Sequence, residues 1–129
     1  MSGDAHLILA VVTCPRGALL VHRPGEDPPA FFPGSRPLKG EKPGTTAERG
    51  VLEDTRLRVR TGKVIGRHPH AMHRRPVIYV AATPLDDVTE DALSMSLAIG
   101  WYSLEQVAML LPDLHPPVRE HLAATIRRR

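Results

Sequence analysis

The sequence predicts a mixed α/β fold, and three observations carry this prediction. The chain has 129 residues, enough to bury one core and too few for two, so we expect one domain over residues 1–129. Its composition, 42% hydrophobic and 24% charged, lies in the range of globular proteins, and the aliphatic residues are spread along the chain. Thirteen prolines imply many loops with a fixed backbone φ, which favours mixed α/β structure over a helical bundle.

The first predicted element is a β-hairpin. Residues 7–13 are apolar and β-branched, and residues 18–21 are apolar again after a turn signal. Residues 24–44 hold six prolines and four glycines, too many for a helix or a long strand. We therefore expect a long ordered loop. In it, the pair Phe31 and Phe32 is more typical of a packed core than of a platform for base stacking.

A helix is predicted to begin where this loop ends. Thr45 and Glu48 match a capping box, in which Thr45 accepts a hydrogen bond from a free helix N–H and Glu48 reaches back. The helix should run to about residue 55. Its buried side should hold Ala47, Val51 and Leu52.

Two strands should follow the helix, over residues 57–67 and 75–83, because both segments are rich in β-branched residues. A basic turn with three histidines should join them. The remaining predicted elements are an acidic loop at 86–91, a strand at 98–102, a helix from its cap Ser103 to Leu111, and a last helix that Pro116 opens.

Composition also indicates in which compartment the protein is found and which partners it binds. Cys14 is the one cysteine, so no disulfide can form within the chain, and no leader-like segment or membrane-spanning apolar run is evident. We therefore expect a soluble cytoplasmic protein. The net charge of +3 is small, and the basic residues lack interleaved aromatics, which argues against nucleic acid as a partner. A small ligand is the expected partner, and a homodimer is compatible with the sequence.

Glycine, acidic residues and arginine recur at fixed spacing between residues 34 and 57. The stretch resembles the Nudix box, G-x5-E-x7-R-E-U-x-E-E-x-G-U, where U is a bulky aliphatic residue, and it keeps the spacing without a gap. Two substitutions damage the pattern, since Gly50 replaces the glutamate after the arginine and Arg56 replaces the closing glycine. The residues at the other positions are Ser35 for the first glycine, then Glu41, Arg49, Val51, Glu53, Asp54 and Leu57.

The order of the predicted elements also resembles that of the Nudix superfamily, over nearly the whole chain. This resemblance implies a Nudix fold, with a mixed β-sheet sandwiched between helices. It further implies that Mg²⁺ or Mn²⁺ is bound by Glu53, Asp54 and the backbone carbonyl of Gly34, with Glu53 as the catalytic residue. Hard ions prefer oxygen ligands, and carboxylates three and four residues apart lie on one helix face. Because position 50 is glycine, two of three carboxylates remain.

Neighbouring residues have implied roles as well. Glu41 would brace the loop against the helix through Arg49, whereas the alternative for Arg49 is a surface salt bridge to Glu53. A glycine inside a helix costs about 1 kcal/mol relative to alanine. Gly50 therefore either reflects drift after loss of function or makes room for a ligand or a neighbouring backbone. We expect Gly50→Glu to raise the metal affinity and any hydrolytic rate, because it restores a carboxylate pair with Asp54 and removes a glycine from the helix interior.

Three basic side chains are candidates for binding substrate. Residues 67–75 hold three histidines and three arginines, which fit a solvated turn, an anion site or a transition-metal site. Comparable strands contact substrate in Nudix proteins, so the resemblance selects His70 and Arg75. Arg23 stands at the end of the second predicted strand, where it resembles a position used against substrate phosphates. Its alternative role is that of a charged strand end.

Two functions follow from the resemblance. The first is a Nudix-type hydrolase acting on a nucleoside diphosphate-linked compound or a nucleoside triphosphate, with weak or altered magnesium-dependent pyrophosphohydrolase activity. The second is a catalytically inactive nucleotide-binding or regulatory module that kept the Nudix cleft. Loss of one metal carboxylate lowers the rate, because the ion both neutralises charge and activates water. A screen for phosphate release, combined with a binding measurement, distinguishes the hydrolase from the inactive binding module.

Overall fold

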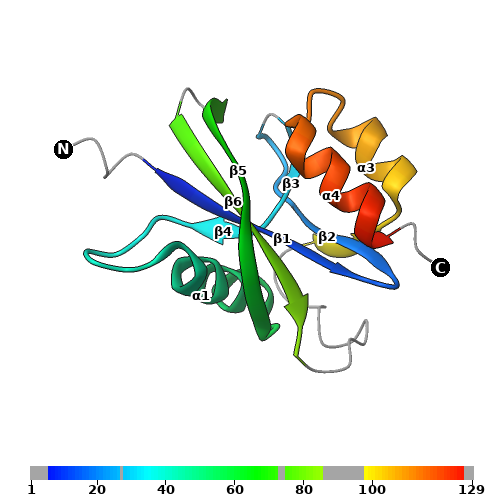
Figure 1. The fold of residues 1–129 in the computed structure, drawn as a ribbon. Coiled ribbons are helices and arrows are strands. Elements are labelled where there is room, and N and C mark those ends of the chain that lie inside the picture. Colours follow the sequence, from blue (N-terminus) through cyan, green and yellow to red (C-terminus); the bar gives the residue numbers. More distant parts are fainter. Residues whose placement is uncertain (1–5, 27, 73–74, 86–97, 127–129) are drawn as a thin grey trace.

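A computed structural model gives the fold of the chain, a twisted β-sheet with helices on both sides (Figure 1). The structure describes residues 6–26, 28–72, 75–85 and 98–126, with the backbone alone at 69–72, 75 and 98. The described elements are β1 (Leu7–Cys14), β2 (Gly17–His22), β3 (Ala30–Phe31), β4 (Gly34–Ser35), α1 (Pro43–Thr55), β5 (Val59–Met72), β6 (Arg75–Pro84), β7 (Ala98–Tyr102), α3 (Leu104–Leu110) and α4 (Pro116–Ile126).

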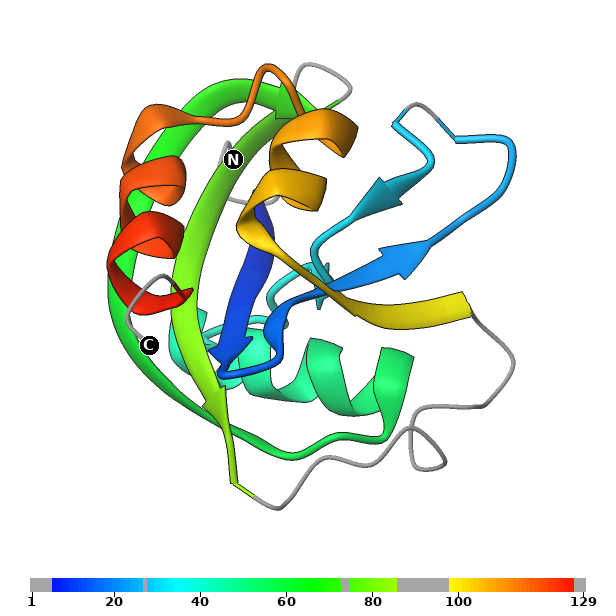
Figure 2. The same ribbon diagram turned by 90° about the vertical axis from the view of Figure 1, so that its right-hand side faces the viewer.

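The sheet is mixed, as predicted, and β1 runs through its centre. β1 pairs in parallel with β6 along six residues, while β5 pairs with β6, and β2 with β7, in antiparallel fashion. The β1–β2 hairpin is paired at Thr13–Ala18 and Cys14–Gly17, next to its turn. Farther from the turn, β1 pairs with β4 and β2 pairs with β3. The two hairpin strands therefore diverge, as Figure 2 shows.

Two apolar clusters pack on opposite faces of this sheet. Ile8 and Val12 lie on the α1 side, and Leu9 and Val11 lie on the α3 and α4 side, because successive side chains of a strand point to opposite faces. All four are at most 5% exposed. Helix α1 thus covers one face, and α3 and α4 cover the other (Figure 2). The helices contribute Ala47 and Val51 from α1, Val107 from α3, and Val118 and Leu122 from α4.

The predicted capping box is wrong. Helix α1 begins at Pro43, earlier than expected, because proline at the first helical position has a fixed φ that suits the helix. Thr45 is not the cap, and Glu48 instead accepts hydrogen bonds from the backbone N–H and the hydroxyl of Thr61, at 3.3 and 2.8 Å.

Three other expectations need correction. Leu52 is 43% exposed, because the face of α1 that meets the sheet is centred on Val51. The loop at 24–44 contains the two-residue strands β3 and β4, which pair with β2 and β1. The basic segment is mostly strand, since β5 continues to Met72 and pairs with β6 up to the Met72–Arg75 pair.

The later elements agree with the prediction. Strand β7 covers 98–102, and α4 begins at Pro116. Ser103 and Gln106 form a complete capping box, with the Gln106 N–H donating to the Ser103 hydroxyl at 3.1 Å and the Ser103 N–H donating to the Gln106 side chain at 2.8 Å. Among the described residues, no helix is long and apolar enough to cross a membrane.

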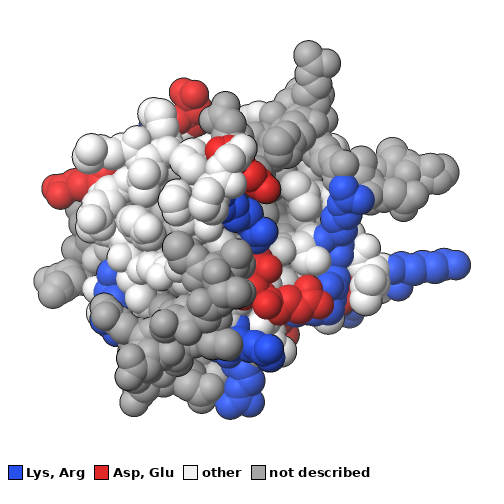
Figure 3. Space-filling model, turned by 180° about the vertical axis from the view of Figure 1, so that it is seen from behind, with Lys and Arg blue, Asp and Glu red and all other residues white. Residues whose placement is uncertain are grey.

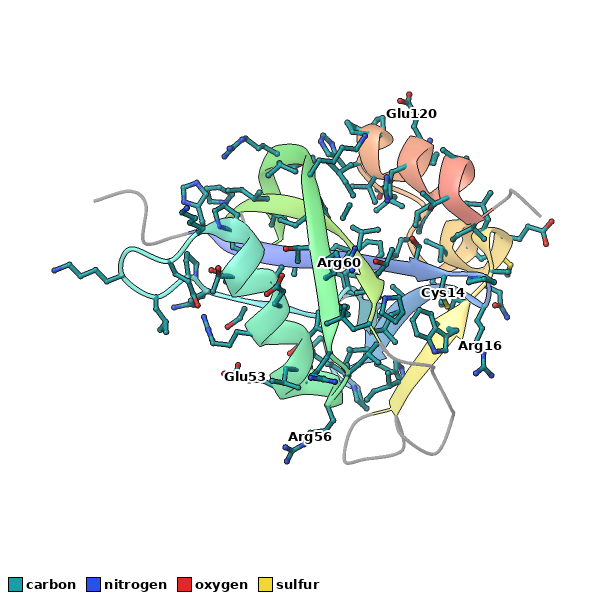
Figure 4. The ribbon with its side chains drawn as sticks, turned by 60° about the horizontal axis from the view of Figure 1, so that its bottom comes forward. Cys14, Arg16, Glu53, Arg56, Arg60 and Glu120 are labelled. Carbon is teal, nitrogen blue, oxygen red and sulfur yellow. The ribbon has the colours of Figure 1, made fainter. Side chains whose placement is uncertain are left out.

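Arg56 ends α1 in a left-handed conformation, with φ of 65°. Within the described part of the chain it is the one residue other than glycine with a positive φ, and its side chain points away from the molecule (Figure 4). Because glycine adopts this conformation without a Cβ penalty, we expect Arg56→Gly to raise the free energy of unfolding by about 1 kcal/mol. Urea denaturation measures the change. Arg56→Ala keeps the Cβ and should give no gain, so an equal gain from alanine would contradict this explanation.

Candidate functional site

Helix α1 and strand β4 touch backbone to backbone at two glycines. A Cβ on Gly50 would lie 2.6 Å from the carbonyl carbon of Gly34 and 3.0 Å from its carbonyl oxygen. A Cβ on Gly34 would in turn collide with the backbone of Ile8 and with Leu9 on β1. Strand β4 is therefore held closely between β1 and α1. A neighbouring backbone, that of Gly34, therefore fills the space beside Gly50. A glutamate side chain at position 50 would collide with it, so we no longer expect Gly50→Glu to raise the metal affinity.

Arg49 links α1 to the loop that precedes it. Its Nε and Nη2 atoms donate to the two carboxylate oxygens of Glu41 at 3.0 and 2.8 Å. Nη2 also donates to the Arg36 carbonyl at 2.8 Å, and Nη1 approaches the Ser35 hydroxyl at 3.3 Å. The hydrogen bond from Arg49, together with one from the Leu38 N–H, lowers the pKa of Glu41 to about 2. These contacts are those that the bracing hypothesis requires.

Glu53 and Asp54 each face an arginine. Glu53 is 58% exposed and lies 3.3 Å from Nη1 of Arg49, so the surface salt bridge exists beside the contacts to the loop. Asp54 is more buried, with its side chain 19% exposed, and its carboxylate accepts a hydrogen bond from Nη2 of Arg23 at 2.9 Å. Burial raises the pKa of Asp54, while Arg23 and the Gly34 N–H, which donates to the same carboxylate, oppose the rise.

The arrangement of these residues does not fit a divalent metal. No group of three or more His, Cys, Asp or Glu side chains in the described part of the chain could hold an ion. Gly50 supplies no carboxylate, and Glu53 and Asp54 are both paired with arginines. On the face seen in Figure 3, acidic side chains lie next to basic ones. The acidic loop at 86–91 lies outside the described residues.

A cavity of about 350 Å³ opens where β1 and β2 diverge. Its walls combine the aliphatic side chains of β1 and β2 with an aromatic ring from β3 and two arginines. Phe32 is 3% exposed and packs edge-on against Tyr79, so it belongs mainly to the core, whereas Phe31 is only partly buried. The residues that matter for ligand chemistry are Leu7, Val21, Arg23, Glu26, Phe31 and Arg36.

The structure brings most of the predicted site residues together. Arg23, Gly34 and Asp54 meet at the edge of the cavity, and Glu41, Arg49 and Glu53 form the neighbouring cluster on α1. The side chains of His70 and Arg75 lie outside the described residues.

Sequence reasoning missed two features of this site. Arg36 was not selected, although a basic residue beside Ser35 in a proline-rich loop was the available signal. The Arg23–Asp54 pair was also missed. Its partners are 31 residues apart, and no local pattern links them.

Solved structures of known proteins share this fold. A crystallised ADP-ribose pyrophosphatase from Streptococcus suis is 18% identical, with a TM-score of 0.64 over 84% of this chain and 90% of that chain. A MutT protein from Methanosarcina mazei is 18% identical, with a TM-score of 0.65 over 93% of this chain and 91% of that chain. A NUDIX hydrolase from Nitrosomonas europaea is 15% identical, with a TM-score of 0.66 over 94% and 86%.

At these identities the structures establish the fold alone, and they confirm the predicted α/β Nudix architecture. The family profile described as "NUDIX domain" matches residues 5–125, nearly the whole chain. Three observations indicate the same family: the spacing of the box, the mixed sheet between helices and this profile match. The chain therefore belongs to the NUDIX domain family.

Proposed function

We propose that this protein binds a small phosphate-containing ligand of the nucleotide class in the cavity between β1 and β2, and that its magnesium-dependent pyrophosphohydrolase activity is weak or absent. One observation carries the proposal. Both remaining carboxylates of the incomplete box are paired with arginines, and one of those arginines, Arg23, lines the cavity. The site therefore presents arginine side chains, which suit an anionic ligand. It presents no unpaired carboxylate of the box, which a metal ion would need.

The lining of the cavity suits a ligand with one flat apolar part and one anionic part. Phe31 offers a partly exposed ring against which a base can pack, with Leu7 and Val21 as aliphatic walls. Arg23 and Arg36 offer guanidinium groups, which bind phosphate through two parallel hydrogen bonds. A mostly apolar cavity with a few polar groups is the usual form of a small-molecule site.

Weak hydrolysis follows from the state of Glu53, the candidate catalytic residue. Cleavage of a diphosphate requires cations at the phosphates and an activated water. Glu53 is largely exposed and is held by Arg49, and position 50 has no room for the third carboxylate. These observations support binding over turnover.

A residual hydrolase is the second candidate. Glu53, Asp54 and Gly34 keep the box spacing, and one similar structure is named an ADP-ribose pyrophosphatase. For this function, Mg²⁺ or Mn²⁺ would have to displace Arg23 from Asp54. Relatives in the family act on phosphate-containing nucleotides, so both candidates share a ligand class and differ in turnover.

Binding and turnover can be measured side by side. We expect ADP-ribose, nucleotide-sugars or nucleoside triphosphates to raise the melting temperature, with product release at background in Mg²⁺ or Mn²⁺. For ADP-ribose and nucleotide-sugars, phosphate is counted after alkaline phosphatase treatment, because cleavage of the diphosphate leaves phosphomonoesters. For nucleoside triphosphates, which alkaline phosphatase would itself hydrolyse, the nucleoside monophosphate is separated and measured by chromatography. Phe31→Ala should weaken binding roughly tenfold by removing the stacking ring. Met109→Ala, at an 82% exposed position on α3, is the matched control and should change nothing.

Two results would contradict the proposal. Metal-dependent product release that Glu53→Gln abolishes would establish the hydrolase instead. Absence of binding by every ligand class, in a protein that melts cooperatively, would reject this cavity as a nucleotide site.

A further inference from the structure

We infer that the guanidinium of Arg23 takes the place of a divalent cation at Asp54, so that phosphate binding in the cavity is independent of metal. The inference rests on the proposed function and deepens it, because it names the group that neutralises the phosphate. It also accounts for the disagreement between a family that generally uses divalent metals and a site that does not fit one.

The backbone fixes Arg23 where β2 ends. Its N–H donates to the Pro29 carbonyl at 2.6 Å, and its own carbonyl accepts from the Glu26 N–H at 3.2 Å. The side chain then extends to Asp54 on α1, which its Nη2 atom reaches at 2.9 Å. A guanidinium has five N–H donors in one plane, so contact with one carboxylate leaves others for a ligand. Because Arg23 also lines the cavity, those donors are available to a phosphate there.

Asp54 is surrounded by hydrogen-bond donors, which is the opposite of what a cation requires. The Gly34 N–H and Arg23 both donate to its carboxylate. Gly50, close to the Gly34 carbonyl that was expected as a backbone ligand, supplies no further oxygen. Hard cations need several oxygen ligands around one point. A metal could therefore reach Asp54 only by displacing Arg23, so the guanidinium and the ion are mutually exclusive.

This exclusion has a measurable consequence for ligand binding. The arginine is attached to the chain, whereas a divalent ion must be taken up from solution. A phosphate in the cavity would meet Arg23, already oriented by Asp54, and the nearby Arg36. Chelating divalent ions should then leave the affinity unchanged.

The first test uses the unmodified protein and ADP-ribose, with calorimetry in EDTA and in millimolar Mg²⁺. We expect dissociation constants that agree within about twofold, since no ion takes part. Arg23→Gln should weaken binding about tenfold or more, because a charged hydrogen bond to phosphate is lost. Arg60→Gln removes the same charge from an exposed position on β5 that does not line the cavity, and should bind normally (Figure 4).

The second test uses Mn²⁺ alone and the melting temperature. The unmodified protein should show no stabilisation, whereas Arg23→Gln should gain one, because Asp54 is then free to bind the ion. The double variant Arg23→Gln with Asp54→Asn should lose that gain. If Arg23→Gln fails to fold, Arg23→Lys keeps a cation at this place and should still bind ADP-ribose in EDTA.

The outcomes separate the two proposals. ADP-ribose binding that requires Mg²⁺ would overturn the inference and leave the cavity as the ligand site. Equal stabilisation of the unmodified protein and Arg23→Gln by Mn²⁺ would also overturn it. No binding of ADP-ribose or any other nucleotide in either condition would instead overturn the proposed function.

Discussion

Replacing Gly50 by alanine is expected to lower the free energy of unfolding by about 2 kcal/mol, and Gly50→Glu by more. The added Cβ would lie 2.6 Å from the Gly34 carbonyl carbon and 2.9 Å from its Cα, and both atoms are backbone. Strand β4 cannot retreat, because Gly34 is in equally close contact with Ile8 and Leu9 of β1. The helix must shift instead. The intrinsic preference of helices for alanine, about 1 kcal/mol, offsets only part of this cost.

Urea denaturation of Gly50→Ala beside Gly62→Ala tests this expectation. A Cβ on Gly62 would meet only the Ala81 carbonyl oxygen, at an ordinary 3.9 Å, so this control should keep or gain stability. A more stable Gly50→Ala would mean that α1 and β4 are not packed backbone to backbone. The site as described would then be open to a glutamate at position 50.

The contact between Gly50 and Gly34 also bears on why the Nudix box lacks one carboxylate. The space beside Gly50 is not empty. The backbone of Gly34 occupies the space beside Gly50, where an added Cβ would lie within 3.0 Å of three of its atoms. The close approach of β4 to α1 therefore accounts for the absence of a carboxylate at position 50.

Local patterns in the sequence predicted the fold well. Successive residues of β1 are buried on opposite faces of the sheet, as the period of a strand requires, and the Ser103 capping box depends on residues three apart. The capping box expected at Thr45 failed for a tertiary reason, since Glu48 binds Thr61 on β5. A short pattern cannot show whether a polar side chain has a distant partner.

The candidate site was predictable only where the family spacing fixed it. That spacing placed Glu41 beside Arg49, and the structure places them in contact. The cavity could not be predicted, because it depends on how far β1 and β2 diverge after the hairpin turn. The Arg23–Asp54 pair was equally inaccessible, since it forms only when the end of β2 meets the end of α1.

Arg49→Ala is expected to lower the melting temperature by roughly 5–10 °C, because charged hydrogen bonds to several groups are lost together. Glu41, 10% exposed, would lose two donors at once, and the Arg36 carbonyl would lose another. Arg49→Lys keeps the charge without the planar fork, so it should recover only part of the loss. Arg60→Ala is the control for loss of one exposed arginine and should have little effect.

The pH dependence identifies which contact of Arg49 matters most. Hydrogen bonds from Arg49 first, and then from the Leu38 N–H and the Thr46 hydroxyl, lower the pKa of Glu41 from 4.5 to about 2, so the Arg49–Glu41 pair stabilises the fold fully above pH 4.5. This contribution is lost as the pH falls from 4.5 towards 2, where Glu41 takes up a proton in the folded state too. The gap in melting temperature between the unmodified protein and Arg49→Ala should therefore narrow across that range. A gap that stays constant would assign the stabilisation to the Ser35 and Arg36 contacts, which do not titrate, and would reject Glu41 as the brace.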